Sequence, residues 1–204
     1  EVDIIDLLGR DPVPPVPELL ARNIKDKVVM VTGAGGSIGS ELCRQIIKNQ
    51  PAKIIIYELT EFALYSIEKE LRLTASCEII PILGSVLDES KLERVIEQYG
   101  VQTIYHAAAY KHVPLVECNP LAGLKNNAVG TAFSVNAAVK KGVETFVLIS
   151  TDKAVRPTNV MGATKRMAEL YCQAMAEAQD QTQISIVRFG NVLGSSGSVV
   201  PLFK

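Results

Sequence analysis

The sequence of 204 residues has no paired cysteine motif and no arrangement of metal ligands. Its four cysteines are scattered, and no two of them form a C-x-x-C pair: Cys43, Cys77, Cys118 and Cys172. This spacing indicates buried free thiols in a reducing compartment rather than a disulfide framework or a zinc site. No cluster of histidine, cysteine and aspartate has metal-ligand spacing either, so we expect no metal.

Long apolar runs and an excess of one charge are also absent. No apolar stretch approaches the ~18 residues that a membrane helix needs, and no signal peptide is present. The net charge of −1 and the pI of about 6.2 argue against nucleic acid or a membrane surface as a partner. With 48% hydrophobic residues, the chain is long enough to bury the core of one domain, and we expect it to be soluble.

The two ends of the sequence indicate a fragment. It begins at Glu1 rather than at a methionine, and it stops in the apolar stretch 201–204 without a terminal tail. Residues 1–27 form a charged lead-in, whose dense prolines stiffen the segment and prevent regular pairing. We place the domain itself at residues 28–204.

Apolar runs alternate with segments of helical periodicity throughout residues 28–204. The predicted strands are 27–32, 53–57, 78–83, 103–107, 145–150 and 184–189. The predicted helices are 37–48, 61–73, and segments near 88–98, 119–141 and 160–179. Continuously apolar strands that are each followed by a helix indicate an α/β fold, a Rossmann-like doubly wound parallel sheet with helices on both faces.

A glycine-rich turn joins the first predicted strand to the first predicted helix. Gly33, Gly36 and Gly39 follow the pattern G-x-x-G-x-x-G, with Ser37 and Ile38 inside it. Such glycines permit a tight turn and let backbone N–H groups approach a pyrophosphate at the positive end of the helix. A glycine triplet alone is also compatible with an ordinary turn, but this one has the strand–turn–helix context that dinucleotide binding requires.

The ends of two further strands complete the predicted cofactor site. Glu58 ends the second strand, where a carboxylate can accept hydrogen bonds from the adenosine ribose hydroxyls and repel a 2′-phosphate. No arginine follows it closely, so we expect NAD rather than NADP, although a solvated strand-end glutamate is the simpler alternative. Ala107 and Ala108 follow the fourth strand, and their small side chains let a cofactor lie against the backbone.

Several separated blocks of this sequence resemble the polysaccharide-biosynthesis branch of the extended short-chain dehydrogenases, which are UDP-N-acetylglucosamine 4,6-dehydratases. The blocks lie at residues 32–41, 106–114, 126–131, 150–165 and 188–194. The superfamily normally carries Tyr-x-x-x-Lys, but here Met161 stands where the tyrosine would be, four residues before Lys165. Membrane-anchored members of this branch also carry methionine there, so the departure agrees with the branch.

The resemblance implies a reaction that needs no outside reductant. NAD takes hydride from C4 of a UDP-N-acetylhexosamine, water is lost across C5 and C6, and the hydride returns to C6. The product is a UDP-4-keto-6-deoxy sugar for surface polysaccharide. The resemblance also implies a homo-oligomer, and a parent protein anchored at the cytoplasmic face of the bacterial inner membrane. That anchor and a smaller sugar-nucleotide lobe are expected to be absent from this chain.

The resemblance also assigns roles to the catalytic residues. Lys165 would hold the nicotinamide ribose and lower the pKa of the group that accepts the C4 hydroxyl proton, while Thr151 would bond the C4 oxygen. Asp152 would be the general acid, for which we predict a raised pKa, and Lys153 would be the C5 base, which requires a neutral amine. A thioether cannot transfer protons, so Met161 would provide apolar packing.

The expected substrate contacts lie on three segments. Lys111 and His112 follow the fourth strand, and Asn127 is expected to bond the backbone beside the site. Arg188 and Asn191 are expected at or after the end of the sixth strand, where the family binds the sugar nucleotide, and Asn191 is the better candidate for substrate contact. His106 is expected to be structural. Simpler roles remain open for several residues: a turn cap for Asp152, and a phosphate contact or surface position for Lys153.

Two other functions fit the same fold. A sugar-nucleotide epimerase or reductase would use the same cofactor, but it would have no use for the Asp152–Lys153 pair. A non-catalytic NAD-binding module would explain the missing tyrosine. Release of water without net change in the cofactor distinguishes the dehydratase from both.

Overall fold

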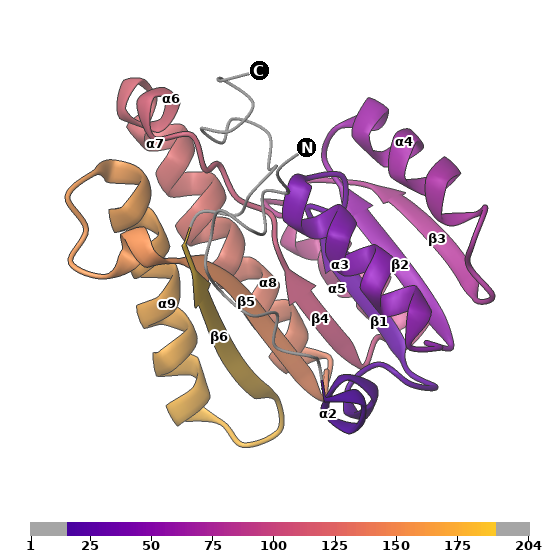
Figure 1. The fold of residues 1–204 in the computed structure, drawn as a ribbon. Coiled ribbons are helices and arrows are strands. Elements are labelled where there is room, and N and C mark those ends of the chain that lie inside the picture. Colours follow the sequence, from indigo (N-terminus) through magenta and orange to yellow (C-terminus); the bar gives the residue numbers. More distant parts are fainter. Residues whose placement is uncertain (1–15, 191–204) are drawn as a thin grey trace.

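The computed structural model describes residues 16–190, and these form a six-stranded parallel sheet in the order β3-β2-β1-β4-β5-β6 (Figure 1). The strands are β1 (Val28–Thr32), β2 (Lys53–Glu58), β3 (Glu78–Leu83), β4 (Thr103–His106), β5 (Thr145–Thr151) and β6 (Gln183–Phe189). Every neighbouring pair runs parallel. The predicted doubly wound sheet is therefore confirmed, and each predicted strand differs from the observed one by at most one residue at either end.

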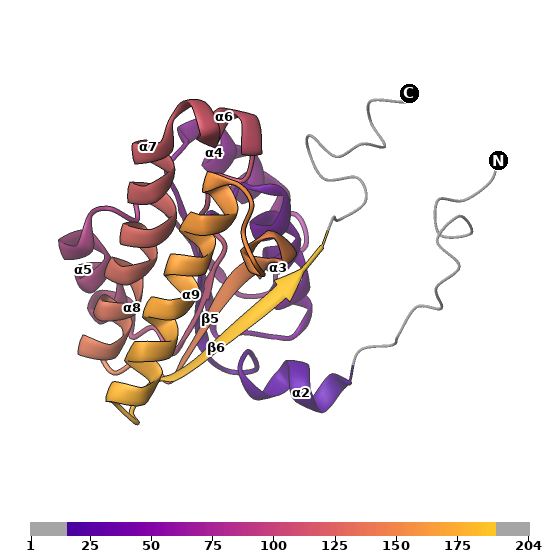
Figure 2. The same cartoon turned by 90° about the vertical axis from the view of Figure 1, so that its left-hand side faces the viewer.

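Helices cover both faces of the sheet. They are α2 (Pro17–Arg22), α3 (Ser37–Lys48), α4 (Glu61–Leu71), α5 (Glu89–Tyr99), α6 (Val113–Cys118), α7 (Pro120–Leu124), α8 (Gly130–Lys140) and α9 (Val160–Ala178), with a π-helical turn η1 (Lys125–Val129) and a 3₁₀ turn η2 (Asp152–Ala154). Helices α3 and α4 lie on one face, and α5, α8 and α9 lie on the other (Figures 1 and 2).

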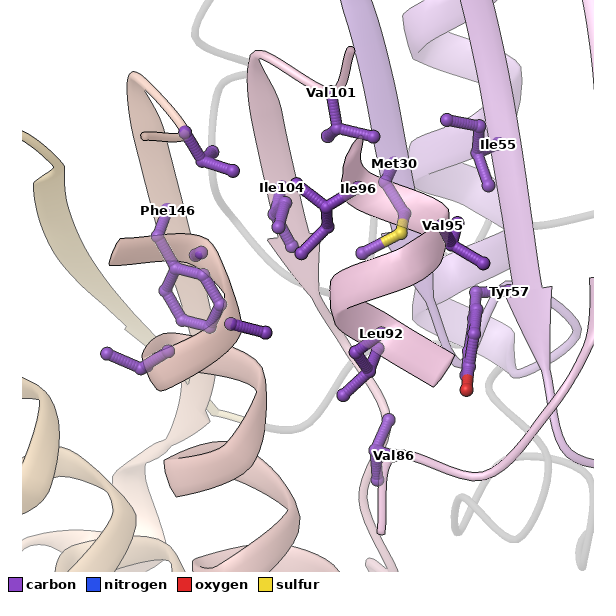
Figure 3. Packing of buried hydrophobic residues seen from close by; sticks show 14 of the residues in the cluster. Met30, Ile55, Tyr57, Val86, Leu92, Val95, Ile96, Val101, Ile104 and Phe146 are labelled. Atoms are coloured by element: carbon purple, nitrogen blue, oxygen red, sulfur yellow. The ribbon is translucent and has the colours of Figure 1, made fainter. Parts of the chain in front are cut away.

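Strand β1 shows why the central strands are apolar without alternation. Val29 and Val31 pack into the core beside α3 and α4, while Met30 packs into the core on the opposite face. Figure 3 shows Met30 and Ile104 of the sheet close to Ile96 of α5. Because both faces of the strand are covered, both sets of alternating side chains must be hydrophobic.

The predicted lead-in is not uniform, because its second part belongs to the domain. Prolines in this segment did not exclude regular structure: α2 starts at Pro17, where a proline at the first helical position loses no hydrogen bond. Ile24 is only 4% exposed and packs into the core beside α3 and α4. Thr103 at the start of β4 donates a hydrogen bond to the Asn23 carbonyl at 2.8 Å. Residues 16–27 therefore cover the end of the sheet at which the strands begin. Residues 1–15 lie outside the described part.

The segment predicted as one helix at 119–141 is three elements in the structure. Helix α7 passes into the π-helical turn η1 and then into α8. Helix α6 was not predicted at all. The periodicity of apolar residues continues through a π turn, so the sequence pattern gave no sign of the wider coil at Asn126 and Asn127.

The cysteine prediction holds only in part. All four thiols are free; Cys43 and Cys172 are buried, but Cys77 is partly exposed and Cys118 is exposed. Within residues 16–190, no helix is both long enough and apolar enough to cross a membrane.

The sheet order places a cleft at the carboxyl ends of β1 and β4. From β1 the chain proceeds through α3 to β2 on one side, whereas β4 lies on the other side of β1. The loops after these two strands therefore leave in opposite directions, and this divergence is where open α/β sheets bind ligands.

The anchoring role of Ile24 gives a test of the domain boundary. Ile24→Ala should lower the free energy of unfolding by about 2–5 kcal/mol, because it leaves a cavity in the core. The control Leu19→Ala, at a side chain that is 66% exposed on α2, should change stability by less than about 0.5 kcal/mol. Denaturant unfolding measures both. Equal, small effects would mean that the segment is only a lead-in.

Candidate functional site

In the glycine turn after β1, neighbouring backbone atoms lie so close to Gly33 and Gly39 that neither position has space for a side chain. Gly33 has a φ of 67°, and a Cβ there would lie 2.7 Å from the Ala108 Cα. A Cβ at Gly39 would collide with the Gly33 carbonyl oxygen. Gly36 caps the start of α3 in an extended conformation. The turn therefore brings the N-terminus of α3 and the end of β4 together, as dinucleotide binding requires.

Two cavities meet at this turn. The smaller, of about 270 Å³, is lined by Gly33, Glu58 and Ala108 among others. The larger, of about 800 Å³, extends from the first turn of α3 toward α6 and α9. Both share Gly36, Ala107, Ala109 and Tyr110. The predicted residues that line the larger cavity are Gly36, Ser37, Ile38, Gly39, Ala107, Lys111, His112, Thr151, Lys153, Met161 and Lys165.

Glu58 braces the glycine turn from the end of β2. Its Oε2 accepts a hydrogen bond from the Gly35 amide at 3.0 Å. Its Oε1 accepts from the amides of Leu59 and Thr60 at 2.9 and 3.0 Å. Three backbone donors thus fix the carboxylate beside the smaller cavity, which is more order than a solvated strand-end glutamate would have. A carboxylate offers about four acceptor positions, so capacity remains for a ligand diol.

Lys165 lies inside the domain rather than on the surface of α9. It is 4% exposed, and its Nζ donates to the Ile149 carbonyl of β5 at 2.7 Å. Burial lowers the pKa of Lys165 to about 8. The ammonium has two further protons to donate toward the larger cavity, which it lines.

Met161 lies one turn before Lys165 on the same wall of the larger cavity. It is 4% exposed, as expected of apolar packing. The start of its helix is fixed by Asn159, whose Oδ1 accepts from the Gly162 amide at 2.8 Å. A Cβ at Gly162 would collide with the Lys153 carbonyl oxygen, so only glycine lets α9 pack this closely on η2.

The predicted raised pKa of Asp152 is wrong for this structure. The Thr151 hydroxyl donates to Oδ1 at 3.0 Å and lowers the pKa of Asp152 below its usual range, and Lys153 adds to the effect. The side chain is 57% exposed, so desolvation is too weak to favour the neutral acid. Lys153 is also not a buried amine: it is 36% exposed, with Nζ 3.3 Å from Asp152 Oδ1.

Asn127 supports the cavity wall from behind and does not line it. It is fully buried in η1, and its amide bonds both the N–H and the carbonyl of Tyr110 at 2.7 and 2.9 Å. It also donates to the Thr164 hydroxyl at 3.0 Å. The expected backbone contact is therefore present, but the assignment of Asn127 to substrate binding is not supported. Asn191 lies outside the described residues, and Lys111 and His112 are exposed at the cavity.

His106 is structural, as expected. It has no solvent exposure; its Nδ1 lies 2.8 Å from the Thr32 hydroxyl, and its Nε2 lies 3.1 Å from the Thr131 hydroxyl. Thr131 donates its proton to the Asn127 carbonyl at 2.7 Å, so Nε2 is the nitrogen that carries hydrogen. This chain of bonds ties the end of β1 to α8 and η1.

The ion cluster behind the site was not predicted. Glu169 of α9 has no exposure and bonds Ser150, Arg166 and Arg188. Arg188 was expected after the sixth strand near the substrate, but it lies inside β6 and faces Glu169. Only the spacing of Glu169, four residues after Lys165, pointed to a shared helix face. In residues 16–190, no group of three or more histidine, cysteine or acidic side chains is placed to hold a metal ion.

Comparison with known proteins places the chain among polysaccharide biosynthesis proteins. The profile of the family described as "Polysaccharide biosynthesis protein" matches residues 29–204. The chain is 48% identical to the capsular polysaccharide biosynthesis protein CapD of Staphylococcus aureus, over 100% of this chain and 34% of CapD. It is 39% identical to a UDP-N-acetylglucosamine 4,6-dehydratase (inverting) of Campylobacter jejuni, over 87% of this chain and 53% of the dehydratase.

A solved structure agrees with these sequence relatives. The X-ray structure of Pen from Bacillus thuringiensis matches with a TM-score of 0.83 and 31% identity, over 89% of this chain and 57% of that protein. The chain spans between about a third and about half of the two relatives' length. These comparisons confirm the polysaccharide biosynthesis family and the fold that the sequence predicted.

The buried histidine makes stability depend on pH in a defined window. Burial lowers the pKa of His106 to about 3, and the nearby Lys165 adds to this, whereas an unfolded histidine has a pKa of about 6.5. The unfolded chain binds the extra proton, so this stability is complete above pH 6.5 and is lost as the pH falls toward 3. The slope approaches about 1.4 kcal/mol per pH unit.

Denaturant unfolding from about pH 7 to about pH 5.5, above the range where most carboxylates titrate, isolates this effect. His106→Gln should reduce the slope of the unfolding free energy against pH by the contribution of about one proton, and it should lower stability at neutral pH. His112→Gln, at the exposed histidine, should leave the slope unchanged. A slope that persists in His106→Gln would show that another group causes the acid sensitivity.

Proposed function

The chain belongs to the polysaccharide biosynthesis protein family, and we propose that its parent protein is an NAD-dependent UDP-N-acetylhexosamine 4,6-dehydratase. The observation that carries the proposal is the larger cavity, whose wall runs from the glycine turn to Thr151, Lys153, Met161 and Lys165. One cavity thus joins the glycine turn to Thr151, Lys153 and Lys165, and Asp152 lies beside Lys153 in η2 without lining the cavity itself. The name of the Campylobacter jejuni relative supports this reaction.

The crowded turn fits a dinucleotide. Gly33 and Gly39 leave no space for a Cβ, so backbone amides at the start of α3 are accessible to a pyrophosphate. Glu58 would accept from the adenosine ribose, Ala107 and Ala108 would lie against the cofactor, and Lys165 would donate to the nicotinamide ribose. Bound NAD would supply the acceptor that takes hydride from C4 and returns it to C6.

Without a tyrosine, the C4 hydroxyl proton must leave through other groups. Met161 is buried and cannot accept it. Thr151 lines the cavity, and its hydroxyl would relay the proton from the C4 oxygen to solvent water, which leaves the Asp152 carboxylate free for the later step. Lys165, charged and buried nearby, would stabilise the oxygen as the proton leaves.

Elimination would be the task of Asp152 and Lys153. In the unliganded chain they form a carboxylate–ammonium pair. A carboxylate accepts protons and an ammonium donates them, so we assign removal of the C5 proton to Asp152 and protonation of the departing C6 oxygen to Lys153. This order reverses the one that the family resemblance implies. The new C4 carbonyl acidifies the C5 proton, which makes a carboxylate strong enough as a base.

The choice of cofactor tests the role of Glu58. The parent should bind NAD more tightly than NADP, because the fixed carboxylate repels a 2′-phosphate. Glu58→Gln, which retains the side-chain length that braces Gly35, should narrow the ratio of the two dissociation constants at least several-fold, while the nearby control Glu61→Gln should not. Titration of both cofactors measures the ratio. Equal or tighter binding of NADP by the unaltered protein would refute the assignment.

Exchange of the C5 proton tests the elimination step in the full-length protein. Asp152→Asn should lose C5 exchange with deuterated water, whereas Lys153→Met should retain exchange but lose product. Each should lower turnover by roughly 10²–10⁴-fold, the usual contribution of an acid–base group. Both variants should still oxidise C4, so reduced cofactor should accumulate. The opposite exchange pattern would restore the order that the resemblance implies and show that substrate binding protonates Asp152.

A further inference from the structure

Glu169 on α9 is a fully buried charge that the proposed reaction does not use. Its Oε1 accepts from the Ser150 hydroxyl at 2.6 Å and from Arg188 Nε at 2.8 Å. Its Oε2 accepts from Arg188 Nη2 at 2.6 Å and from Arg166 Nη1 at 3.1 Å. Burial alone would raise the pKa of Glu169, but hydrogen bonds from Arg188, Ser150 and Arg166 lower it to about 2, so it stays ionised.

Two of the three groups bound by Glu169 come from strands that build the cavity. Ser150 of β5 and Arg188 of β6 are direct partners in the parallel ladder. The next residues along each strand, Thr151 and Phe189, line the larger cavity. Successive side chains of a strand point to opposite faces, so holding Ser150 and Arg188 against α9 fixes the direction of Thr151 and Phe189.

The same carboxylate lies one helical turn beyond Lys165. Residues four apart share a helix face, and both side chains reach the end of β5: Lys165 bonds the Ile149 carbonyl, and Glu169 bonds Ser150. Burial has the largest effect on the pKa of Lys165 and lowers it; Cys172 and then the charge of Glu169 raise this pKa and so oppose burial.

We propose that Glu169 is a positioning residue of this site, which fixes the ends of β5 and β6 against α9 and keeps the Lys165 ammonium charged beside the cavity. The inference rests on the proposed function, because Lys165 matters through the cofactor that it would hold. This role differs from ordinary stabilisation of the fold, because loss of the Glu169 charge should change the pH dependence of cofactor binding.

Other ionisable groups lie around Lys165. Besides Glu169, α9, the elements packed against it and β4 carry these: Tyr105, His106, Glu117, Cys118, Lys125, Lys140, Asp152, Lys153, Arg166, Tyr171, Cys172, Glu177 and Arg188. His106 and Cys172 stay neutral near the pKa of Lys165, because burial lowers the pKa of His106 to about 3 and raises that of Cys172 to about 12. The arginines stay charged.

The test measures the dissociation constant of NAD against pH in the full-length protein. Binding by the unaltered protein should weaken as the pH rises through about 8, where Lys165 loses its proton. Glu169→Gln has nearly the same shape but no charge. The pH at which NAD binding weakens, here called the alkaline limb, should therefore fall by about one pH unit, the lower end of the effect of a neighbouring opposite charge. An unmoved limb would overturn the inference.

Two further variants separate an effect on the charge of Lys165 from an effect on folding. Arg188→Gln removes the bidentate bond but leaves the Glu169 charge, so its limb should stay or move up even if stability falls. A downward shift in Arg188→Gln would also overturn the inference, and this test holds even if Glu169→Gln does not fold. Glu70→Gln, which breaks an exposed bidentate pair with Arg44 on α3, should leave the limb in place. If the unaltered protein binds no NAD, the proposed function itself fails.

Discussion

The close packing of the glycine turn on the end of β4 is the constraint on which the rest of the site depends. A Cβ at Gly33 would lie 2.7 Å from the Ala108 Cα, and one at Gly39 would collide with the Gly33 carbonyl oxygen. This contact sets the distance between β1, α3 and the loop after β4. Both cavities meet at it, and their walls share Gly36, Ala107, Ala109 and Tyr110.

Helix α9 provides the second fixed element, and its attachment explains how a site without the usual tyrosine is organised. Its N-terminus packs on η2 through Gly162, and its middle is held to β5 and β6 by Glu169. Met161 and Lys165 lie between these two attachments. The methionine closes the wall against water, and the buried lysine supplies the charge. In the proposed reaction, proton transfer would fall to Thr151 at the end of β5 and to Asp152 and Lys153 of η2, against which α9 packs.

The sequence predicted the parts of the fold that follow from local periodicity. The apolar runs of β1 and β2 and the helix α3 were placed almost to the residue, because burial on both faces or on one stripe leaves a clear pattern. The π turn η1 was missed because apolar spacing barely changes there. The docking of Ile24 was missed because one apolar residue among prolines and charges has no periodicity.

The sequence predicted which residues gather at the site, but not their protonation states. Gly33, Glu58, Met161 and Lys165 were expected at one cleft, and the structure brings them to two adjoining cavities. The charge of Asp152 was predicted wrongly, because a pKa depends on exposure and on neighbouring donors that a sequence does not display. The pairing of Glu169 on α9 with Arg188 on β6 joins residues 19 apart and depends on how α9 packs against β6, which sequence spacing alone cannot predict.

The central claim is that one cavity moves a hydride from C4 to C6 of the same sugar while water is lost. The most direct measurement uses the full-length protein, NAD and UDP-N-acetylglucosamine carrying deuterium at C4, with the product examined by NMR and mass spectrometry. The account predicts a 4-keto-6-deoxy sugar with the deuterium at C6 and no net reduced cofactor. A product that keeps its C6 oxygen, with deuterium still at an inverted C4, would contradict it and identify an epimerase.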